Sequence, residues 1–255
     1  MSEVIVIPAL GDNYIYLLTL GTEAIAFDPA VSSPVLRILK ERNIRLRTIF
    51  NTHCHFDHVG GNEELKQKSA CTVIGPDKER TPAIDRVARD GDIIPVGPLA
   101  VHVIGTPGHT ESDLSYYIPA SEAHPVGMVW TGDTLFIGGC GRLFGGSAEV
   151  MWSSLGRLMA LPTETAVYCA HEYTVENYEF AAMIEPDNKA VRDRLEEVQA
   201  LIRVGKPTVP STVGREKATN PFVRAATPMM KKALHMADKS DAAVFRELRR
   251  RKDIF

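Results

Sequence analysis

Cysteine is scarce and dispersed in this sequence. The four cysteines, Cys54, Cys71, Cys140 and Cys169, form no CxxC pair. Disulfide-stabilised scaffolds are short chains dense in cysteine. We therefore expect reduced thiols in an intracellular protein rather than a disulfide framework.

Long apolar runs and a basic leader are also absent. No apolar run approaches the roughly 18 residues that a membrane span needs. The first residues, MSEVIVIPALGDNYIYLL, carry an acidic residue and a proline, so we interpret them as strands of the fold rather than as a signal peptide. We expect a soluble, cytoplasmic protein with no membrane partner.

The composition is otherwise that of an ordinary globular protein. The chain has 255 residues, of which 44% are apolar and 24% are charged, and its formal net charge is −3. These values exclude a disordered chain, a collagen-like repeat and a coiled-coil rod. A chain of this size can form one large domain, or one domain with a smaller one beside it.

Positive charge is concentrated toward the C-terminus. Residues 205–255 hold 12 Lys/Arg against 5 Asp/Glu, a net charge of +7, whereas the first 204 residues have a net charge of −10. On charge alone a solvated helical face is the favoured explanation. Nucleic acid and a small anionic ligand are the functional alternatives.

The expected secondary structure changes near residue 172. Strands are expected in the first part at 3–9, 13–19, 23–28, 46–51, 99–105, 113–118, 127–132 and 166–170, with helices at 32–43 and 147–159. The second part is expected to be helical at 175–205, 228–239 and 241–253, with a loop at 206–222. This pattern predicts an α+β protein, with a mixed domain at 1–172 and a small helical domain at 173–255.

Three histidines and an aspartate lie together directly after the expected strand at 46–51. The stretch THCHFDHVGG holds His53, His55, Asp57 and His58. A surface histidine run is the alternative, but the Gly-Gly pair that closes this strand-end loop argues against it. We interpret the HxHxDH stretch as a metal-binding loop.

Three more polar residues follow expected strands in the same way. They are His109 in GTPGHT, Asp133 in TGDTLF and His171 in AHEYT. Each alone would more simply be a cap or a hydrogen-bonded loop residue. Together with the HxHxDH stretch they provide seven candidate ligands, at strand ends where sites are commonly built.

Seven ligands are too many for one zinc ion and suit two divalent ions. If Asp133 bridges the ions, each receives four protein ligands. The first set would be His53, His55, His109 and Asp133, and the second would be Asp57, His58, His171 and Asp133. Zinc fits this donor set, and iron and manganese are alternatives.

The remaining candidates are expected to have structural roles. Cys54 should point into packing, because the seven-ligand set needs no thiolate. We expect His102, His124 and His235 to be structural or surface residues. Two nearby dications generate a hydroxide at neutral pH and polarise a carbonyl, so the set predicts a two-metal hydrolase. A serine hydrolase has no support, since no GxSxG elbow is present.

The motifs together resemble the metallo-β-lactamase superfamily and, within it, the glyoxalase II (hydroxyacylglutathione hydrolase) family. The HxHxDH loop, GHT, GDTLF and AHEYT carry the superfamily resemblance. The GCGR segment, HEYT and the closing RxxKD narrow it to glyoxalase II, and the likeness runs over nearly the whole chain. It implies an αββα sandwich followed by a helical domain that helps to bind glutathione.

The resemblance also implies the reaction and the substrate contacts. The reaction would be hydrolysis of S-D-lactoylglutathione to D-lactate and glutathione, the second step of methylglyoxal detoxification. A metal-bridging hydroxide would attack the thioester carbonyl, with Asp57 and Asp133 acting through the metal ions. The substrate-binding residues would be Arg142, Phe144, Tyr173, Arg249 and Lys252. We expect a monomer with a glutathione thioester as its small-molecule partner.

The sequence departs from the family pattern at two places. Ser112 and Asp113 stand where the family usually shows Gly-His, which affects the loop after His109. Phe144 stands where some members have tyrosine, so one hydroxyl contact to glutathione would be missing.

Three other functions remain open from the sequence. A persulfide dioxygenase of the same superfamily would use a single iron with a glutathione-based substrate. A superfamily nuclease is suggested only by the basic tail, which lacks aromatic residues interleaved for base stacking, so no nucleic-acid partner is expected. A non-enzymatic binding module would leave the complete ligand set without a role.

Overall fold

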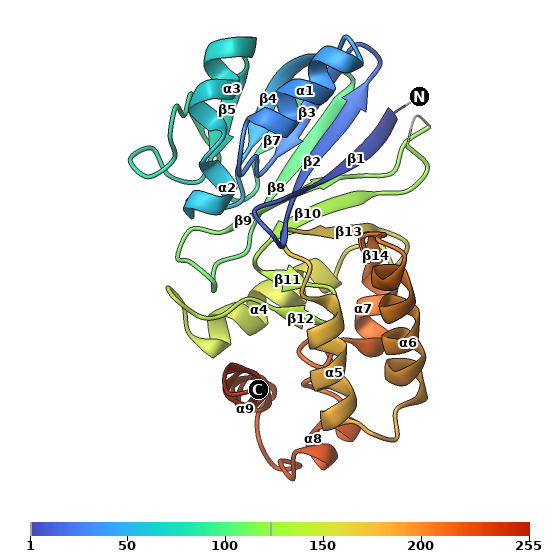
Figure 1. Cartoon of the computed structure of the whole chain (residues 1–255). Helices are drawn as coiled ribbons and strands as arrows, with labels where there is room; N and C mark the ends of the chain where they lie inside the picture. Colours follow the sequence, from blue (N-terminus) through green and yellow to red (C-terminus); the bar gives the residue numbers. More distant parts are fainter. Residues whose placement is uncertain (1, 123) are drawn as a thin grey trace. The chain divides into compact units, whose positions relative to one another are not determined.

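The computed structural model describes residues 2–122 and 124–255, and the chain divides into two compact units (Figure 1). Unit 1 comprises Met1–Gly105 and Ser112–Gly132, and unit 2 comprises Thr106–Glu111 and Asp133–Phe255.

The first sheet of unit 1 follows the order of the sequence. Its strands are β1 (Ser2–Ala9), β2 (Asn13–Leu20), β3 (Glu23–Phe27), β4 (Arg45–Phe50), β5 (Thr72–Gly75) and β6 (Arg86–Val87). Neighbours from β1 to β3 are antiparallel, and those from β3 to β6 are parallel. Parallel neighbours need a crossover, which α1 (Ser33–Glu41) supplies between β3 and β4, and α3 (Asn62–Ser69) before β5.

Helices α1 and α3 cover one face of this sheet (Figure 1). Val35 and Leu39 of α1 and Leu65 of α3 are buried against Ile49 and Val73 of the sheet. Burying side chains of this size contributes about 1.5–3 kcal/mol each. The carboxyl ends of the parallel strands are left to carry polar loops, as is usual for such sheets.

The second sheet of unit 1 is antiparallel. Its strands are β7 (Ile93–Val96), β8 (Leu99–Gly105), β9 (Leu114–Ile118) and β10 (Met128–Gly132). Phe27 stacks on Trp130 with ring centroids 3.8 Å apart, and the Phe50 and Tyr116 centroids are 4.7 Å apart. These rings form an aromatic core between the two sheets of unit 1.

Unit 2 is mainly helical. It contains β11 (Leu135–Phe136), β12 (Gly139–Cys140), α4 (Ala148–Met159), β13 (Ala166–Cys169), α5 (Thr174–Ile184), α6 (Lys189–Arg203), β14 (Ser211–Thr212), α7 (Val213–Thr219), α8 (Pro228–Ala233) and α9 (Asp241–Asp253). Phe180, Phe222 and Phe245 are fully buried and pack in sequence, with both neighbouring centroid pairs 5.9 Å apart. Among the described residues, none of the helices combines the length and the hydrophobicity that a membrane crossing demands.

A buried carboxylate ties α7 to the hairpin of β11 and β12. Glu216 is fully buried and accepts hydrogen bonds from the Gly138 amide at 2.9 Å and the Ser211 hydroxyl at 2.5 Å. Burial raises the pKa of this carboxyl group. The Asn220 amide donates to the carbonyls of Phe136 and Gly139, at 3.2 and 3.0 Å. The side chains of α7 and of Asn220 therefore fix the hairpin that follows Asp133.

The segment expected to be helical at 175–205 contains two helices. α5 ends at Ile184 and α6 begins at Lys189. Pro186 lies between them, and a proline restricts the residue before it and lacks an amide hydrogen. The Asn188 side chain then caps α6 by accepting from the Ala190 amide at 3.1 Å.

The loop expected at 206–222 was wrong, because it contains β14 and α7. Thr212 caps α7 by accepting from the Arg215 amide at 3.1 Å, an ordinary N-cap arrangement. The helix expected at 228–239 ends early, at Ala233. Helix α3 and the short strands β5, β6 and β7 were not predicted from the sequence.

Candidate metal centre

The HxHxDH stretch lies on a tight loop after β4, and its second half begins the short helix α2 (Phe56–Val59). The glycines that follow are needed because the chain passes close to residues 29–32. A Cβ on Gly60 would lie 2.6 Å from the Ala30 carbonyl oxygen, and one on Gly61 would lie 2.6 Å from the Pro29 carbonyl oxygen. The Gly-Gly pair therefore fixes the loop against the segment that follows β3.

Unit 1 brings four of the predicted ligands together on this loop. His53 and His58 are fully buried, with 0% of their surface exposed. The His53 Nε2 lies 3.0 Å from the His55 Nδ1, and the His58 Nε2 lies 3.5 Å from the Asp57 Oδ2. The imidazole and carboxylate atoms of these four residues therefore face one another in pairs.

Asp28 orients two of these histidines and was missed from the sequence. Its Oδ2 lies 3.1 Å from the His58 Nδ1 and accepts the Thr52 hydroxyl hydrogen at 2.6 Å. Because that hydrogen is committed to Asp28, the Thr52 oxygen accepts from the His53 Nδ1, 3.1 Å away. The His53 ring thus carries its proton on Nδ1, and the His58 Nδ1 faces a carboxylate, an arrangement typical of metal-binding histidines. Asp28 directly follows β3, which is the same strand-end signal that pointed to the ligands.

Asn13 supports the carboxylate on this loop. Its side-chain amide donates to the Asp57 Oδ2 at 3.0 Å and to the Asp57 carbonyl at 3.1 Å. The Asp57 side chain is 36% exposed, so this contact fixes a carboxylate that solvent would otherwise leave mobile. Asn13 begins β2 and was not singled out in the sequence.

Unit 2 brings the other three predicted ligands together around Asp133. The Asp133 Oδ2 lies 3.4 Å from the His109 Nε2, and its Oδ1 lies 3.4 Å from the His171 Nε2. All three side chains are buried. The Arg142 carbonyl accepts from the His109 Nδ1 at 2.9 Å, so this ring too directs its Nε2 toward the carboxylate.

The spacing between the carboxylate and imidazole atoms fits metal ligation better than ordinary hydrogen bonding. Ligand atoms bound tetrahedrally at about 2.0–2.2 Å from zinc lie about 3.3–3.5 Å from one another. The separations of 3.4 Å at Asp133 and 3.5 Å at Asp57 fall in that range. A hydrogen bond between a charged imidazole and a carboxylate would be about 2.7–2.9 Å long. The histidine and aspartate side chains of each unit therefore have the donor atoms and the spacing of divalent-metal ligands.

Cys54 and the other histidines lie outside these groups. The Cys54 sulfur contacts the Thr81 hydroxyl at 3.3 Å, and burial raises the pKa of the thiol. His102 lies edge-on to the Tyr117 ring, with centroids 6.1 Å apart, His124 is buried, and His235 is exposed.

Tyr173 and Phe144, two predicted substrate-binding residues, lie next to ligand histidines within unit 2. The Tyr173 ring stacks on His171 at 5.0 Å with an interplanar angle of 2°. Phe144 is 69% exposed and lies edge-on to His109 at 5.3 Å. The departure at Phe144 thus leaves an apolar ring at the surface beside a ligand.

Arg249 lies on α9, and acceptors of the protein already surround its guanidinium group. Its Nη1 donates to the Cys140 carbonyl at 2.8 Å, and its Nε and Nη2 each lie 3.0 Å from the Asp253 Oδ1. The Arg142 Nε lies 3.9 Å from the same oxygen, and this side chain is 68% exposed. Asp253 therefore lies between the two predicted glutathione-binding arginines.

Lys252 is buried on the same face of α9, three residues from Arg249. Its ammonium group pairs with Glu176 of α5 and lies 4.9 Å from the centre of the Phe255 ring. Buried charges need such partners, so Glu176 and Asp253 account for the burial of two cations.

Asp113 belongs to the other place where the sequence departs from the family pattern. This residue is buried in unit 1.

Comparison with known proteins extends over the full chain. The family described as hydroxyacylglutathione hydrolase C-terminus matches residues 172–255, and the metallo-beta-lactamase superfamily matches residues 9–171. The chain is 49% identical to the hydroxyacylglutathione hydrolase of Methylococcus capsulatus, with 100% of this chain and 99% of the relative covered. It is 45% identical to the hydroxyacylglutathione hydrolase of Rhodospirillum rubrum, with 98% and 97% covered.

A solved structure agrees with these sequence matches. ETHE1 from Myxococcus xanthus superposes with a TM-score of 0.68 at 25% identity, covering 97% of this chain and 89% of that protein. The expected α+β fold, a metallo-β-lactamase-like sandwich with a helical C-terminal domain, is confirmed. The chain belongs to the hydroxyacylglutathione hydrolase family of the metallo-β-lactamase superfamily.

Proposed function

We propose that this protein hydrolyses S-D-lactoylglutathione and related 2-hydroxyacylglutathiones to the hydroxy acid and glutathione. The observation that carries the proposal is a complete set of histidine and aspartate ligands on a chain that matches hydroxyacylglutathione hydrolases from end to end. The persulfide dioxygenase alternative is not favoured, because the relatives that match the full chain carry the hydrolase name.

The seven ligands suit two divalent ions, zinc in the first place, with iron or manganese as alternatives. His53, His55 and His109 would hold the first ion, Asp57, His58 and His171 the second, and Asp133 both. When bound, such ions supply a hydroxide at neutral pH and polarise the thioester carbonyl. Asp57 and Asp133 then act as metal ligands rather than as general bases.

The departing thiol requires no acid from the protein. A thiol with an ordinary pKa near 8.5 can leave as the thiolate. The chain's task at this end of the substrate is therefore binding. Arg142, Arg249 and Lys252 are the cations we assign to the glutathione carboxylates, since arginine and lysine pair with such groups. Tyr173 and Phe144 would contact the remainder of the tripeptide.

This assignment gives the two parts of the sequence different roles. Residues 1–172 would be the catalytic domain, and residues 173–255 would be the glutathione-binding domain. The positive charge of the C-terminal segment would then serve an anionic small molecule rather than nucleic acid. We expect the protein to act as a monomer, which light scattering of the purified protein can test.

The decisive experiment combines metal analysis with two assays on the same purified protein. We expect close to two divalent ions per chain and loss of the thioester absorbance of S-D-lactoylglutathione, abolished by a chelator. Oxygen consumption with glutathione persulfide, without thioester hydrolysis and with one iron per chain, would instead establish the dioxygenase.

A further inference from the structure

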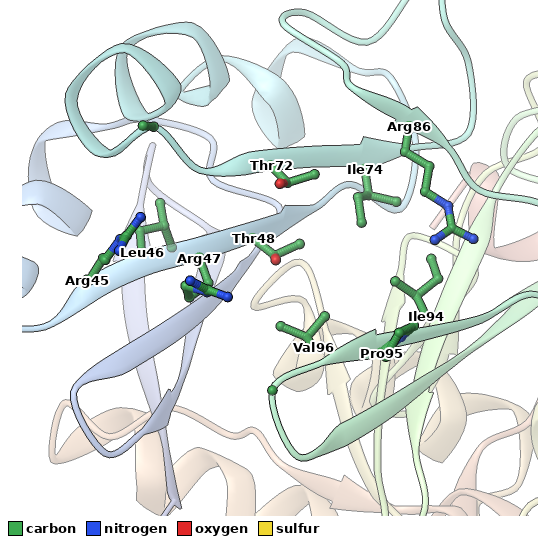
Figure 2. A pocket seen from close by; sticks show the side chains of 12 residues that line it. Arg45, Leu46, Arg47, Thr48, Thr72, Ile74, Arg86, Ile94, Pro95 and Val96 are labelled. Carbon is green, nitrogen blue, oxygen red and sulfur yellow. The ribbon is translucent and has the colours of Figure 1, made fainter.

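Unit 1 contains a cavity that the proposed reaction does not use. It lies at the beginnings of β4 and β5, beside β6 and the β7 strand of the second sheet, and has a volume of about 380 Å³ (Figure 2). The HxHxDH loop lies beyond the opposite end of β4. From Arg47 to His53 the chain is largely extended, so the two places are about 20 Å apart along the strand direction.

The charged side chains that line this cavity are all arginines. Arg45, Arg47 and Arg86 are among its lining residues, and no acidic residue is. Within the described part of the chain the Arg45 side chain has no ion-pair partner. Arg47 is 3.5 Å from Glu23 and Arg86 is 3.7 Å from Asp92, and both arginines are nearly half exposed. Such long, exposed pairs leave most guanidinium donors available.

A β-bulge directs Arg47 to the cavity side of the sheet. Leu46 pairs with Ala24, but Ile25 pairs with Thr48, so Arg47 is an extra residue in β4. Leu46 and Ile49 both pack in the hydrophobic cluster beneath α1 and α3. The two residues between them therefore turn to the other face together. Bulges are known to re-aim side chains near functional sites.

Thr48 places a hydroxyl group on the cavity wall. Its side chain is 6% exposed, and no other group among residues 2–122 and 124–255 hydrogen-bonds to this hydroxyl. The Thr48 oxygen does not belong to the buried polar atoms without a partner, so water in the cavity reaches it. An acidic group of a ligand would replace that water as the hydrogen-bond partner.

Charge and apolar surface alternate along the cavity. Figure 2 shows Arg45 and Arg47 at one end and Arg86 at the other, with Thr48 and the apolar side chains between them. The apolar part of the wall includes Ile74, Ile94, Pro95 and Val96. A ligand matching this wall has an acidic group at each end.

We propose that this cavity binds a small organic dianion, with one acidic group on Arg47 and Thr48 and the other on Arg86. Arginine forks bind carboxylate and phosphate groups in two-point contacts, and the volume lies in the range of small-molecule sites. Carboxylate and phosphate ends share this chemistry. The cavity is separate from the residues assigned to the thioester substrate, so the proposal does not depend on that function.

The test compares linear dicarboxylates with monocarboxylates of equal carbon number, by calorimetric titration of the full-length, metal-loaded protein at low salt. We expect the best dicarboxylate to bind about tenfold or more tightly than its monocarboxylate, as a second charge-assisted contact implies. The Arg86→Ala variant should lose that advantage and bind both acids alike. Thr48→Val should weaken both acids, and a phosphonocarboxylate of matching length distinguishes a phosphate end from a carboxylate end.

Arg37→Ala is the matched control, because Arg37 is an exposed arginine of α1 outside the cavity. It should leave the affinities unchanged. The proposal is overturned if no dianion binds at millimolar concentration, or if dicarboxylates bind no better than monocarboxylates. Equal binding to wild-type protein and Arg86→Ala would also overturn it. If Arg86→Ala does not fold, the test uses the backbone amide NMR shifts of Thr72 and Gly97 in the wild-type protein. We expect these shifts to change when the dicarboxylate is added. Unchanged shifts would overturn the proposal.

Discussion

The Asp28 Oδ2 lies 3.1 Å from the Nδ1 of His58, a ring that is completely buried. The same carboxylate accepts the amide and the hydroxyl of Thr52, at 2.8 and 2.6 Å. Asp28 adopts a φ of 46°, a left-handed conformation that is unusual outside glycine. The residue is thus held by its own backbone turn in the position from which it orients the ligand.

Replacing Asp28 with Asn should weaken metal binding without removing a ligand. The amide keeps the size of the side chain but removes the negative charge beside the His58 Nδ1, and partners of this kind are worth about 10–100-fold in metal affinity. Competition with a chromogenic chelator measures the change. Asp77→Asn, in an exposed turn, is the control and should match the wild-type protein. An unchanged affinity in Asp28→Asn would show that the contact does not orient His58.

Asp133→Ala should lose both metal ions or hold them weakly. The two carboxylate oxygens face different histidines at equal distance, so a single substitution affects both halves of the ligand set. Its loss also leaves two dications less neutralised. Metal content after dialysis, measured with the hydrolysis rate, is the test. Two tightly held ions and near-normal turnover would refute the ligand assignment.

Cys54→Ala should keep most of the activity, whereas His55→Ala should lose it. The Cys54 thiol bonds to Thr81 and burial raises its pKa, so it stays protonated at neutral pH and is a poor ligand. The two variants differ by one position in the same loop, which makes each the control for the other. Similar losses in thioester hydrolysis would mean that the sulfur faces the metal ions.

The Arg249→Ala, Lys252→Ala double variant should raise KM more than it lowers kcat. These cations would act on substrate carboxylates remote from the thioester, where contacts strengthen ground and transition states alike. We expect kcat/KM to fall by about one to two decades on glutathione thioesters, since charge-assisted contacts are worth about 1.5–3 kcal/mol each. A small thioester without the tripeptide should react almost as before.

The structure adds a control to this prediction. Because Lys252 pairs with Glu176 and Arg249 with Asp253, removing both cations leaves two carboxylates without their partners. The free energy of unfolding should therefore be measured on the double variant as well. Equal losses of activity on both thioesters, with lower stability, would mean that the cations support the fold rather than the substrate.

Glu247 should contribute a pH-dependent increment to stability. Hydrogen bonds from Arg250 and Arg251 lower its pKa to about 2. An unfolded Glu titrates near 4.3, so the unfolded state binds the proton first and the stabilisation is lost as pH falls from about 4.3 to 2. The pairs are near the surface, which limits the effect to less than about 1 kcal/mol. Urea unfolding should show Glu247→Gln less stable than wild type at pH 7, and the difference should vanish near pH 2.

The candidate ligands could be singled out from the sequence because they obey one local rule. His53, Asp133 and His171 each follow an apolar strand, and strand ends meet at sheet edges. Asp28 obeys the same rule, yet a single aspartate after a strand is also an ordinary turn residue. Only its contact with His58, thirty positions away, reveals its role. Sequence spacing does not encode such a contact.

The errors in the helical part have a similar origin. Apolar periodicity runs through Pro186, so the break between α5 and α6 is visible only from the proline's backbone chemistry. The short helix α7 has little apolar pattern and is fixed by Glu216, whose partners on the β11–β12 hairpin are distant in sequence. Arg249 and Lys252 were predicted as substrate contacts. The pairing of Lys252 with Glu176 of α5 is visible only in three dimensions, whereas Asp253 is four residues from Arg249 on the same helix and could have been paired with it from the sequence.

The close approach of Gly60 and Gly61 to the chain at Pro29 and Ala30 has a consequence for protein engineering. The ten residues from Thr52 to Gly61 could not be transferred by themselves to another protein. Transplanted alone into another scaffold, they would lack the backbone wall that shapes their turn, and also the Asp28 carboxylate that precedes that wall. A working graft would have to carry both segments, as two strands of a parallel pair with their trailing loops. During evolution, an insertion in the loop after β3 should therefore be tolerated only with a matching change in the loop after β4, because the two loops contact each other.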